Sequence, residues 1–409
     1  RNFNYKNLDE IKEKIEEMID DGLLEDNTTY DDYIFACDRI ELIYKESKEC
    51  RDSRGSSIIT DKLLDNESRT STSKRSAWVL YKNKLLNEKH FSKVSIKIIE
   101  NDTEIIRKRL STEYSEDIGA IKGMVVGAIQ SGKTANMGAL ISQCADNGWN
   151  FFIILGGMLE NLRMQTEKRL INDFSGKGMF NWVSLSSITN KKADPGQELS
   201  DLDLSNHSHT KYLCVTLKQK DRLNNLLNWI KRDTSNAKNM RVLIIDDEAD
   251  QASLNGYAYK NSKSEEWEDD EYTTTYSSIM KLKGALANHS YIQYTATPQG
   301  PLLISIMDLL SPKHHTVLTP GETYTGGKTF FCDEPGLIIT IPEGEVFHSK
   351  HNNLADCPDS LVNALQLHLM GVAIIVKLLQ KESFLSMMIH ADRDQDASEK
   401  FYRWIKNII

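Results

Sequence analysis

The stretch that decides the fold spans residues 124–134 and reads Met-Val-Val-Gly-Ala-Ile-Gln-Ser-Gly-Lys-Thr. It begins with three apolar residues, continues through a loop with a glycine at each end, and leads into a helix-length segment. Glycines let the backbone N–H groups of such a loop approach an anion closely, and the N-terminus of the next helix favours negative charge. The stretch matches Gly-x-x-x-x-Gly-Lys-Ser/Thr at every fixed position, which predicts a phosphate-binding loop between a buried strand and a helix.

The same stretch predicts the ligands of the loop. Lys133 is expected to reach the β- and γ-phosphates of ATP, and the hydroxyl of Thr134 is expected to bind Mg²⁺. The residues predicted to bind the nucleotide are Gly127, Ala128, Ile129, Gln130, Ser131, Gly132, Lys133 and Thr134. The competing explanation is a chance glycine-rich turn, which would have to match the whole pattern by accident. ATP and Mg²⁺ are therefore the predicted cofactors, and ATP hydrolysis is the predicted reaction.

Short apolar runs alternate with helix-length segments around this loop. Runs that are apolar at every position are typical of buried parallel strands. The predicted strands cover residues 124–126, 151–155, 212–216, 242–245 and 291–295. The sequence therefore predicts an α/β fold with a central parallel sheet.

A second motif lies at residues 241–250, which read Arg-Val-Leu-Ile-Ile-Asp-Asp-Glu-Ala-Asp. Its acids follow an apolar strand, at the end of the strand where ligands bind in open α/β sheets. We expect Asp247 to hold Mg²⁺ through a water and Glu248 to orient or deprotonate the attacking water. Acids after a strand also serve as helix caps. Asp246 is the alternative metal-side acid; we prefer Asp247 because it opens the Asp-Glu-Ala-Asp string.

A third motif, Tyr-Thr-Ala-Thr-Pro-Gln, follows another apolar strand at residues 294–299. Alone it would be an ordinary turn at the end of a strand. Thr295 and Thr297 can hydrogen-bond back to the acids of residues 247–250, so this loop could respond to the γ-phosphate. The order of the three motifs, more than any one of them, indicates a shared site.

In this order the three motifs resemble motifs I, II and III of superfamily II helicases and translocases. That resemblance implies RecA-like lobes. It also places residues 155–166 at motif Ia, which puts Arg163 and Gln165 near a nucleic-acid backbone, and residues 215–220 at motif Ib.

More narrowly, the chain resembles the Z1-domain proteins, which are helicase-like ATPases of bacterial restriction and phage-defence systems. The phrases that carry this likeness lie at residues 126–134, 245–251, 294–299, 320–327 (Pro-Gly-Glu-Thr-Tyr-Thr-Gly-Gly) and 386–390 (Ser-Met-Met-Ile-His). The resemblance implies DNA as substrate and a nuclease or methyltransferase as partner subunits. It also implies an association with endonuclease activity, although we find no nuclease constellation of paired acids and lysine in this sequence. An alternative function is an ATP-dependent switch or scaffold that recruits an effector without moving along DNA.

The 409 residues are expected to form two or three domains. We expect a helical N-terminal region at 1–118, a RecA-like ATPase lobe at 119–300 and a connecting β/turn segment at 301–358. Residues 359–409 are expected to begin a second RecA-like lobe, with a strand at 384–390, and that lobe is expected to be incomplete here.

Composition sets the remaining expectations. A net charge of −9 argues against a broadly basic surface but leaves local basic patches open. The six cysteines form no Cys-x-x-Cys pair, which suits a reducing cytoplasm. The longest apolar run, near residues 371–379, is shorter than a membrane span, so no membrane partner is expected.

Overall fold

The computed structural model describes residues 56–59, 70–111, 121–128, 131–157, 159–176, 178–190, 198–251, 274–298, 312, 314–321, 324–327, 329–348, 351–378, 385–392 and 395–409. The chain divides into two compact units, Arg1–Tyr324 and Thr325–Ile409. The two units are described separately below.

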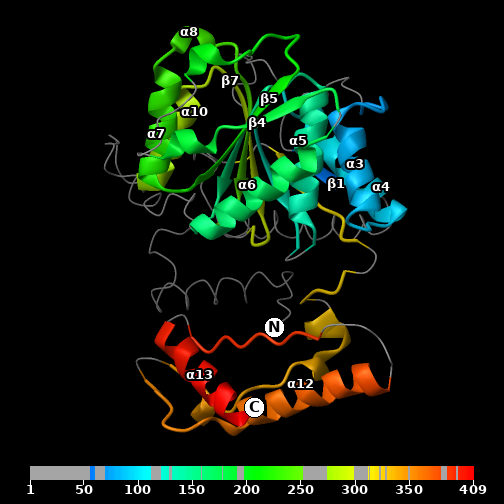
Figure 1. Ribbon diagram of the computed structural model, residues 1–409, viewed down its shortest axis with the longest axis vertical. Helices are drawn as coiled ribbons and strands as arrows, with labels where there is room; N and C mark the ends of the chain where they lie inside the picture. Colours follow the sequence, from blue (N-terminus) through cyan, green and yellow to red (C-terminus); the bar gives the residue numbers. More distant parts are fainter. Residues whose placement is uncertain are drawn as a thin grey trace, which may run out of the picture. The chain divides into compact units, whose positions relative to one another are not determined.

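The first unit is built on a twisted sheet (Figure 1). Its described strands follow the order β1-β8-β2-β7-β6-β3-β5-β4. In that order the strands are Ser56–Ile59, His314–Val317, Ile121–Val126, Asn288–Thr295, Arg241–Asp247, Phe151–Gly156, Thr210–Leu217 and Asn181–Ser184. Each described neighbouring pair is parallel except β1 with β8, which is antiparallel. The predicted α/β fold with a parallel sheet is confirmed.

The strands form because both of their faces are buried. In β3, Phe152 and Ile154 pack into the apolar core on one face of the sheet, while Phe151 and Ile153 pack into the core on the other. Strands covered on both faces have no polar side to alternate with, which is why their sequences read as uninterrupted apolar runs.

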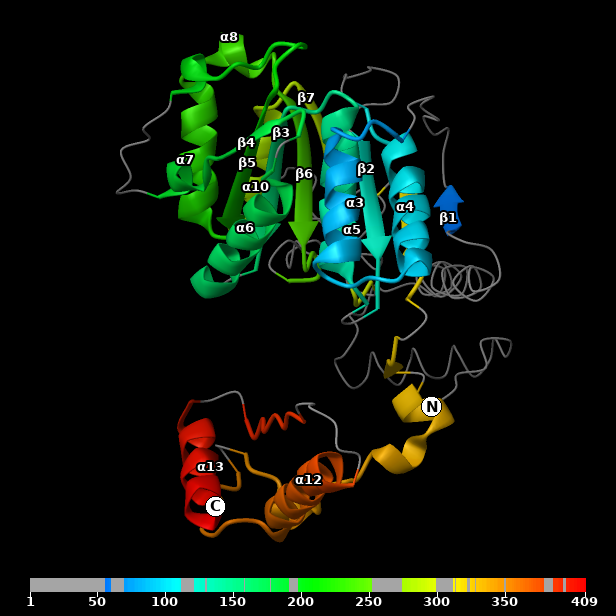
Figure 2. The same cartoon turned by 45° about the vertical axis from the view of Figure 1, so that its right-hand side comes forward.

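Helices cover both faces of this sheet (Figure 2). One face carries α3 (Ala77–Asn87), α4 (Lys93–Lys108), α5 (Lys133–Asp146) and α6 (Glu160–Phe174). The other carries α7 (Lys220–Lys231), the short α8 (Thr234–Ala237) and α10 (Thr274–Gly284). The central helix is α5, whose residues from Ala135 to Ala145 are all buried.

The described N-terminal helices are attached to the sheet domain by specific polar contacts as well as by apolar packing. Ser76 caps α3 by accepting a hydrogen bond from the N–H of Val79. Asp146, at the end of α5, accepts the N–H groups of Ala77 at 2.8 Å and Trp78 at 3.0 Å. An acid at this position also suits the positive end of the α3 dipole. The first turn of α3 is therefore hydrogen-bonded to the C-terminal end of α5.

The second unit contains α12 (Asp359–Lys377) and α13 (Gln395–Ile408), preceded by short helical turns. A small core joins them, in which Phe347 packs edge-on against Phe401 with the ring centroids 6.0 Å apart. The expected strand at 384–390 is absent from the described residues 385–390. A strand needs a hydrogen-bonded neighbour, and within the described part of this unit the pairing is limited to one isolated bridge, His348 with Asn352.

Helix α12 stands out for its apolar composition. Among the described helices it alone is long and apolar enough to cross a membrane, with a mean hydropathy of 1.5 over 18 residues of which 11% are buried. The sequence expectation considered uninterrupted apolar runs, whereas this average also includes isolated polar residues such as Asn363 and His368. The finding is one of length and composition.

Candidate nucleotide site at the carboxyl edge of the sheet

The register of three adjacent strands brings the three sequence motifs together. Val126 at the end of β2 pairs with Thr295 at the end of β7, and Asp247 at the end of β6 pairs with Tyr294. The loops that follow these strands therefore leave the sheet at one edge and side by side. This is the edge where parallel α/β sheets bind ligands.

The phosphate-binding loop has the predicted strand–loop–helix context. It leaves β2 at Gly127, and α5 begins at Lys133. Gly132 has φ +93°, a left-handed conformation that costs a residue with a side chain about 1 kcal/mol or more. Ile129 and Gln130, two of the predicted nucleotide ligands, lie outside the described residues. Ala128, Ser131 and Thr134 are placed on the loop and the first turn of α5 as expected.

The ammonium of Lys133 lies inside the curl of the loop. Its Nζ donates to the backbone carbonyls of Gly127 and Ala128, both at 3.2 Å. Burial lowers the pKa of Lys133, while the negative charges of Asp247, Glu248 and Asp250 act to raise it. The lysine of the first motif and the acids of the second thus lie close enough to interact electrostatically.

The loop fits a phosphate chain on two further grounds. A Cβ at Gly127 would lie 2.8 Å from Cγ of Lys133, so the loop and lysine pack too closely for a side chain there. The hydroxyl of Ser131 is buried and has no hydrogen-bond partner among the described residues. A buried hydroxyl without a partner is costly, and an oxygen-rich ligand in the loop would satisfy it.

The two candidate acids for Mg²⁺ occupy different environments. Asp246 is fully buried, with Oδ1 2.9 Å from Nζ of Lys218 and Oδ2 accepting the hydroxyl of Tyr291. Asp247 is half-buried at the strand end, and burial together with the charge of Glu248 raises its pKa to about 6, against the opposing effect of Lys218 and Lys133. Both oxygens of Asp246 are thus bonded to buried protein groups. Asp247 instead lies close enough to Lys133 for the charge of the lysine to affect its pKa.

Glu248 has an unusual backbone and an exposed side chain. Its φ is +54°, in the left-handed region that residues with a Cβ rarely adopt. Its N–H donates to Oδ1 of Asp247 at 3.1 Å. Its carboxylate lies beside Gly157, where a Cβ would come within 3.2 Å of Oε2. Strained residues of this kind concentrate at functional sites.

The third motif bonds to both of the others. The hydroxyl of Thr295 donates to Oδ1 of Asp250 at 2.7 Å, and its carbonyl accepts the N–H of Gly127 at 3.0 Å. Thr297 takes part through its backbone N–H, which donates to the hydroxyl of Thr295 at 3.0 Å. Thr295 is therefore the physical link between the phosphate loop and the acid turn.

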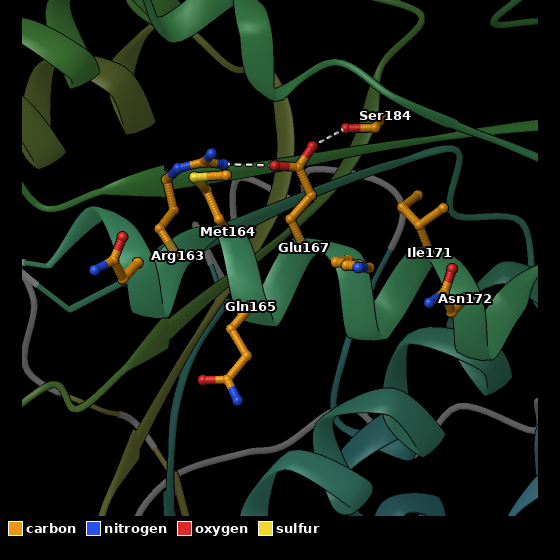
Figure 3. A pocket seen from close by; sticks show the side chains of 9 residues that line it. Arg163, Met164, Gln165, Glu167, Ile171, Asn172 and Ser184 are labelled. Atoms are coloured by element: carbon orange, nitrogen blue, oxygen red, sulfur yellow. Dashed lines mark hydrogen bonds and ion pairs between the residues drawn. The ribbon is translucent and has the colours of Figure 1, made fainter.

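The two predicted nucleic-acid contacts line the same groove but differ in their direction and surroundings (Figure 3). Arg163 and Gln165 are two positions apart on α6, and residues at that spacing point to different sides of a helix (Figure 3). The guanidinium of Arg163 is held by Glu160 at 2.9 Å, Glu167 at 2.6 Å and the carbonyl of Val215 at 3.1 Å. Arg163, Gln165 and Glu167 are among the residues that line an open groove of about 600 Å³ along α6. Gln165 is exposed.

Sequence reasoning missed Lys218. It lies in the segment expected to correspond to motif Ib, yet its side chain is fully buried, beside the carboxylate of Asp246 and the backbone carbonyls of Glu248 and Gln251. The available signal was a lysine directly after an apolar strand, at the same carboxyl edge as the other motifs.

Comparison with known proteins finds partial similarity to solved structures. No protein-family model matches this chain, and no curated protein matches it. Similar solved structures include the DUF1998 helicase MrfA bound to DNA and AMPPNP (12% identity, TM-score 0.35, covering 69% of this chain and 34% of that one). The same helicase bound to DNA gives 12% identity and a TM-score of 0.34, covering 67% of this chain and 34% of that one. A DEAD box protein from the hyperthermophile Methanococcus jannaschii is 17% identical with a TM-score of 0.32, covering 70% of this chain and 67% of that one.

This chain thus spans about a third of the length of the DUF1998 helicase. Its own strand pairing defines the class: an α/β domain with a parallel sheet, in which the loop of residues 127–132 follows β2 at the carboxyl edge. This arrangement is consistent with the RecA-like domain expected from the sequence.

Proposed function

We propose that this chain is a helicase- or translocase-like ATPase that acts on DNA. The observation that supports it best is the meeting of three motifs at one sheet edge, where Thr295 bonds to both the phosphate loop and the acid turn. A loop that binds phosphate and a turn that carries acids are the two components that ATP hydrolysis needs.

Each residue then has a chemical role. The backbone N–H groups of residues 127–132 bind the phosphate chain, and Lys133 exchanges its two carbonyl acceptors for phosphate oxygens. Thr134 would hold Mg²⁺ directly and Asp247 would hold it through a water, and the bound ion would neutralise charge on the phosphate oxygens. The carboxylate of Glu248 accepts the proton of the attacking water. Thr295 and Thr297 connect the state of the site to the neighbouring loops.

The test is a steady-state ATPase assay with Mg²⁺, with and without DNA, at several salt concentrations. Contacts to phosphates should make the stimulation by DNA fall steeply between about 50 and 200 mM salt. Lys133→Ala supplies the background rate. An ATP hydrolysis rate that exceeds this background but is the same with and without DNA at low salt would reject a motor that acts on DNA.

A second function remains supported by one observation. The guanidinium expected to contact the nucleic-acid backbone is already engaged by Glu160, Glu167 and Val215. Because these groups already bind the guanidinium, a nucleotide-dependent switch or scaffold is favoured over a motor that binds DNA through Arg163. Arg163→Ala should weaken DNA binding alike across sequences if Arg163 contacts phosphates. A variant that binds DNA like the parent but is less stable would indicate a structural Arg163.

The biological setting is proposed from the sequence resemblance to Z1-domain proteins. On that basis the chain works in the cytoplasm, in a bacterial restriction or antiviral system, with a nuclease or methyltransferase subunit as partner. Residues 359–409 are proposed to begin a second RecA-like lobe. Co-purification of such a subunit from the native host would support this setting, and purification of the chain free of partners would count against it.

A further inference from the structure

A buried lysine lies beneath the acid turn. Lys218 follows the last residue of β5, and its side chain is fully buried. Its Nζ contacts Oδ1 of Asp246 at 2.9 Å, the carbonyl of Glu248 at 2.7 Å and the carbonyl of Gln251 at 3.0 Å. Three acceptor oxygens thus surround an ammonium group that has three N–H donors.

Two of these acceptors belong to the turn that carries Glu248. The turn closes on itself through the N–H of Gln251, which donates to the carbonyl of Glu248 at 2.8 Å. Within it, Glu248 adopts the left-handed conformation. Without a cation, the carbonyls of Glu248 and Gln251 would point their negative ends at the same buried spot, beside the carboxylate of Asp246.

The direction of the Glu248 carbonyl also restricts the direction of its Cα–Cβ bond, from which the side chain extends. A residue with a given φ and ψ places its carbonyl and its Cβ at set angles, so holding one restricts the other. In this structure the carbonyl is bonded to buried Lys218 while the carboxylate lies beside Gly157, exposed at the carboxyl edge. Release of the carbonyl would let Glu248 relax toward an ordinary conformation and turn its carboxylate away.

We propose that Lys218 is a positioning residue that holds Glu248 in its left-handed conformation and so aims the carboxylate at the attacking water. The inference rests on the proposed function, because it takes Glu248 as the base. Lys218 does not touch the nucleotide and acts through the turn. The site therefore needs Lys218 for hydrolysis and not for nucleotide binding.

The experiment is a double-mutant cycle between Lys218→Met and Glu248→Gln. Lys218→Met should lower kcat about 100-fold in the parent background and less than about threefold in the Glu248→Gln background, because the effect passes through the same carboxylate. Calorimetric affinity for Mg²⁺ with a non-hydrolysable ATP analogue should stay within about threefold. Equal losses in both backgrounds would overturn the proposal.

A second readout does not depend on activity. Hydrogen exchange of the Gln251 amide should accelerate in Lys218→Met, because its acceptor on Glu248 is no longer fixed. Lys211→Met is the matched control: Lys211 is a buried lysine near the start of β5, the strand that Lys218 follows, and it lies over the ring of Phe180 rather than at the acid turn. The control should change neither kcat nor this exchange rate. An unchanged exchange rate of the Gln251 amide in Lys218→Met would show that the turn keeps its conformation without Lys218, and it would overturn the proposal.

Loss of Lys218 leaves the charge of Asp246 buried, which could prevent folding. The pair Asp246→Asn and Lys218→Met removes both charges, and it is compared with Asp246→Asn alone. A lower kcat and faster Gln251 exchange in the pair support the proposal, and equality with Asp246→Asn overturns it. If Glu248→Gln itself hydrolyses ATP normally, the proposed function fails, while the exchange measurement still decides whether Lys218 holds the turn.

Discussion

The buried carboxyl group of Asp102 should make this protein less stable as the pH rises. Asp102 lies on α4, is 2% exposed, and accepts the N–H of Thr319 at 2.9 Å through Oδ2. Burial raises its pKa from 3.8 to about 7, against the lowering effect of the Thr319 hydrogen bonds. We expect Asp102→Asn to remove this dependence, because the amide can still accept from Thr319 but carries no charge.

The sign follows from proton binding. Between about pH 4 and pH 7 the folded chain holds a proton on Asp102 that the unfolded chain has lost, so the free energy of unfolding falls as the pH rises through this window. The difference of about three pKa units corresponds to about 4 kcal/mol as an upper limit, lost by pH 7 to 8. Asp102→Asn should therefore be more stable than the parent at pH 8, and the gain should shrink toward pH 5.

Urea unfolding followed by circular dichroism at pH 5, 6, 7 and 8 measures this difference. The control is Asp173→Asn, which removes another buried carboxylate, one that is paired with Lys89. That variant loses an ion pair and should show no gain at pH 8. An Asp102→Asn variant whose stability differs from that of the parent by the same amount at every pH would refute the reasoning.

Further variants test the nucleotide site. Lys133→Ala should weaken ATP binding about 10- to 100-fold, since charge-assisted bonds to phosphate are lost, and equal affinities by calorimetry would reject the assignment. Glu248→Gln should keep ATP bound but slow hydrolysis by about 100-fold or more in a single-turnover assay. If Asp246→Asn rather than Asp247→Asn abolished Mg²⁺ dependence, our order of the acids would be wrong. Thr295→Val should slow hydrolysis about tenfold at unchanged ATP affinity, because it breaks the bond to Asp250, whereas Thr297→Val should not.

The sheet could be predicted from sequence because its signals are local. Each buried strand, such as β6, is a run of residues that are apolar on both faces, and the phosphate loop is a continuous pattern. The carboxyl edge follows once the strands are parallel, so the meeting of Gly127, Asp247 and Thr295 was within reach of sequence reasoning.

The parts that could not be predicted depend on contacts between distant residues. Lys218 and Glu248 are 30 positions apart in the sequence. The residues around each of them give no sign that the lysine bonds to the turn. Arg163 reads as an exposed cation on a helix, but two glutamates within one turn and the carbonyl of Val215 engage it. Residues 385–390 read as a strand, yet strand formation requires a neighbour that the sequence of the segment does not specify.

The burial of α5 along its length limits how the protein can be cut for laboratory work. Helices α3 and α4 cover one side of α5, and β8 pairs with β2 next to the phosphate loop. Recombinant expression of residues 119–300 alone would strip off these helices and leave β2 as an open sheet edge. Exposed apolar surface and unpaired strand edges are the usual causes of inclusion bodies. Soluble preparations should therefore start before residue 70 and continue past Thr319.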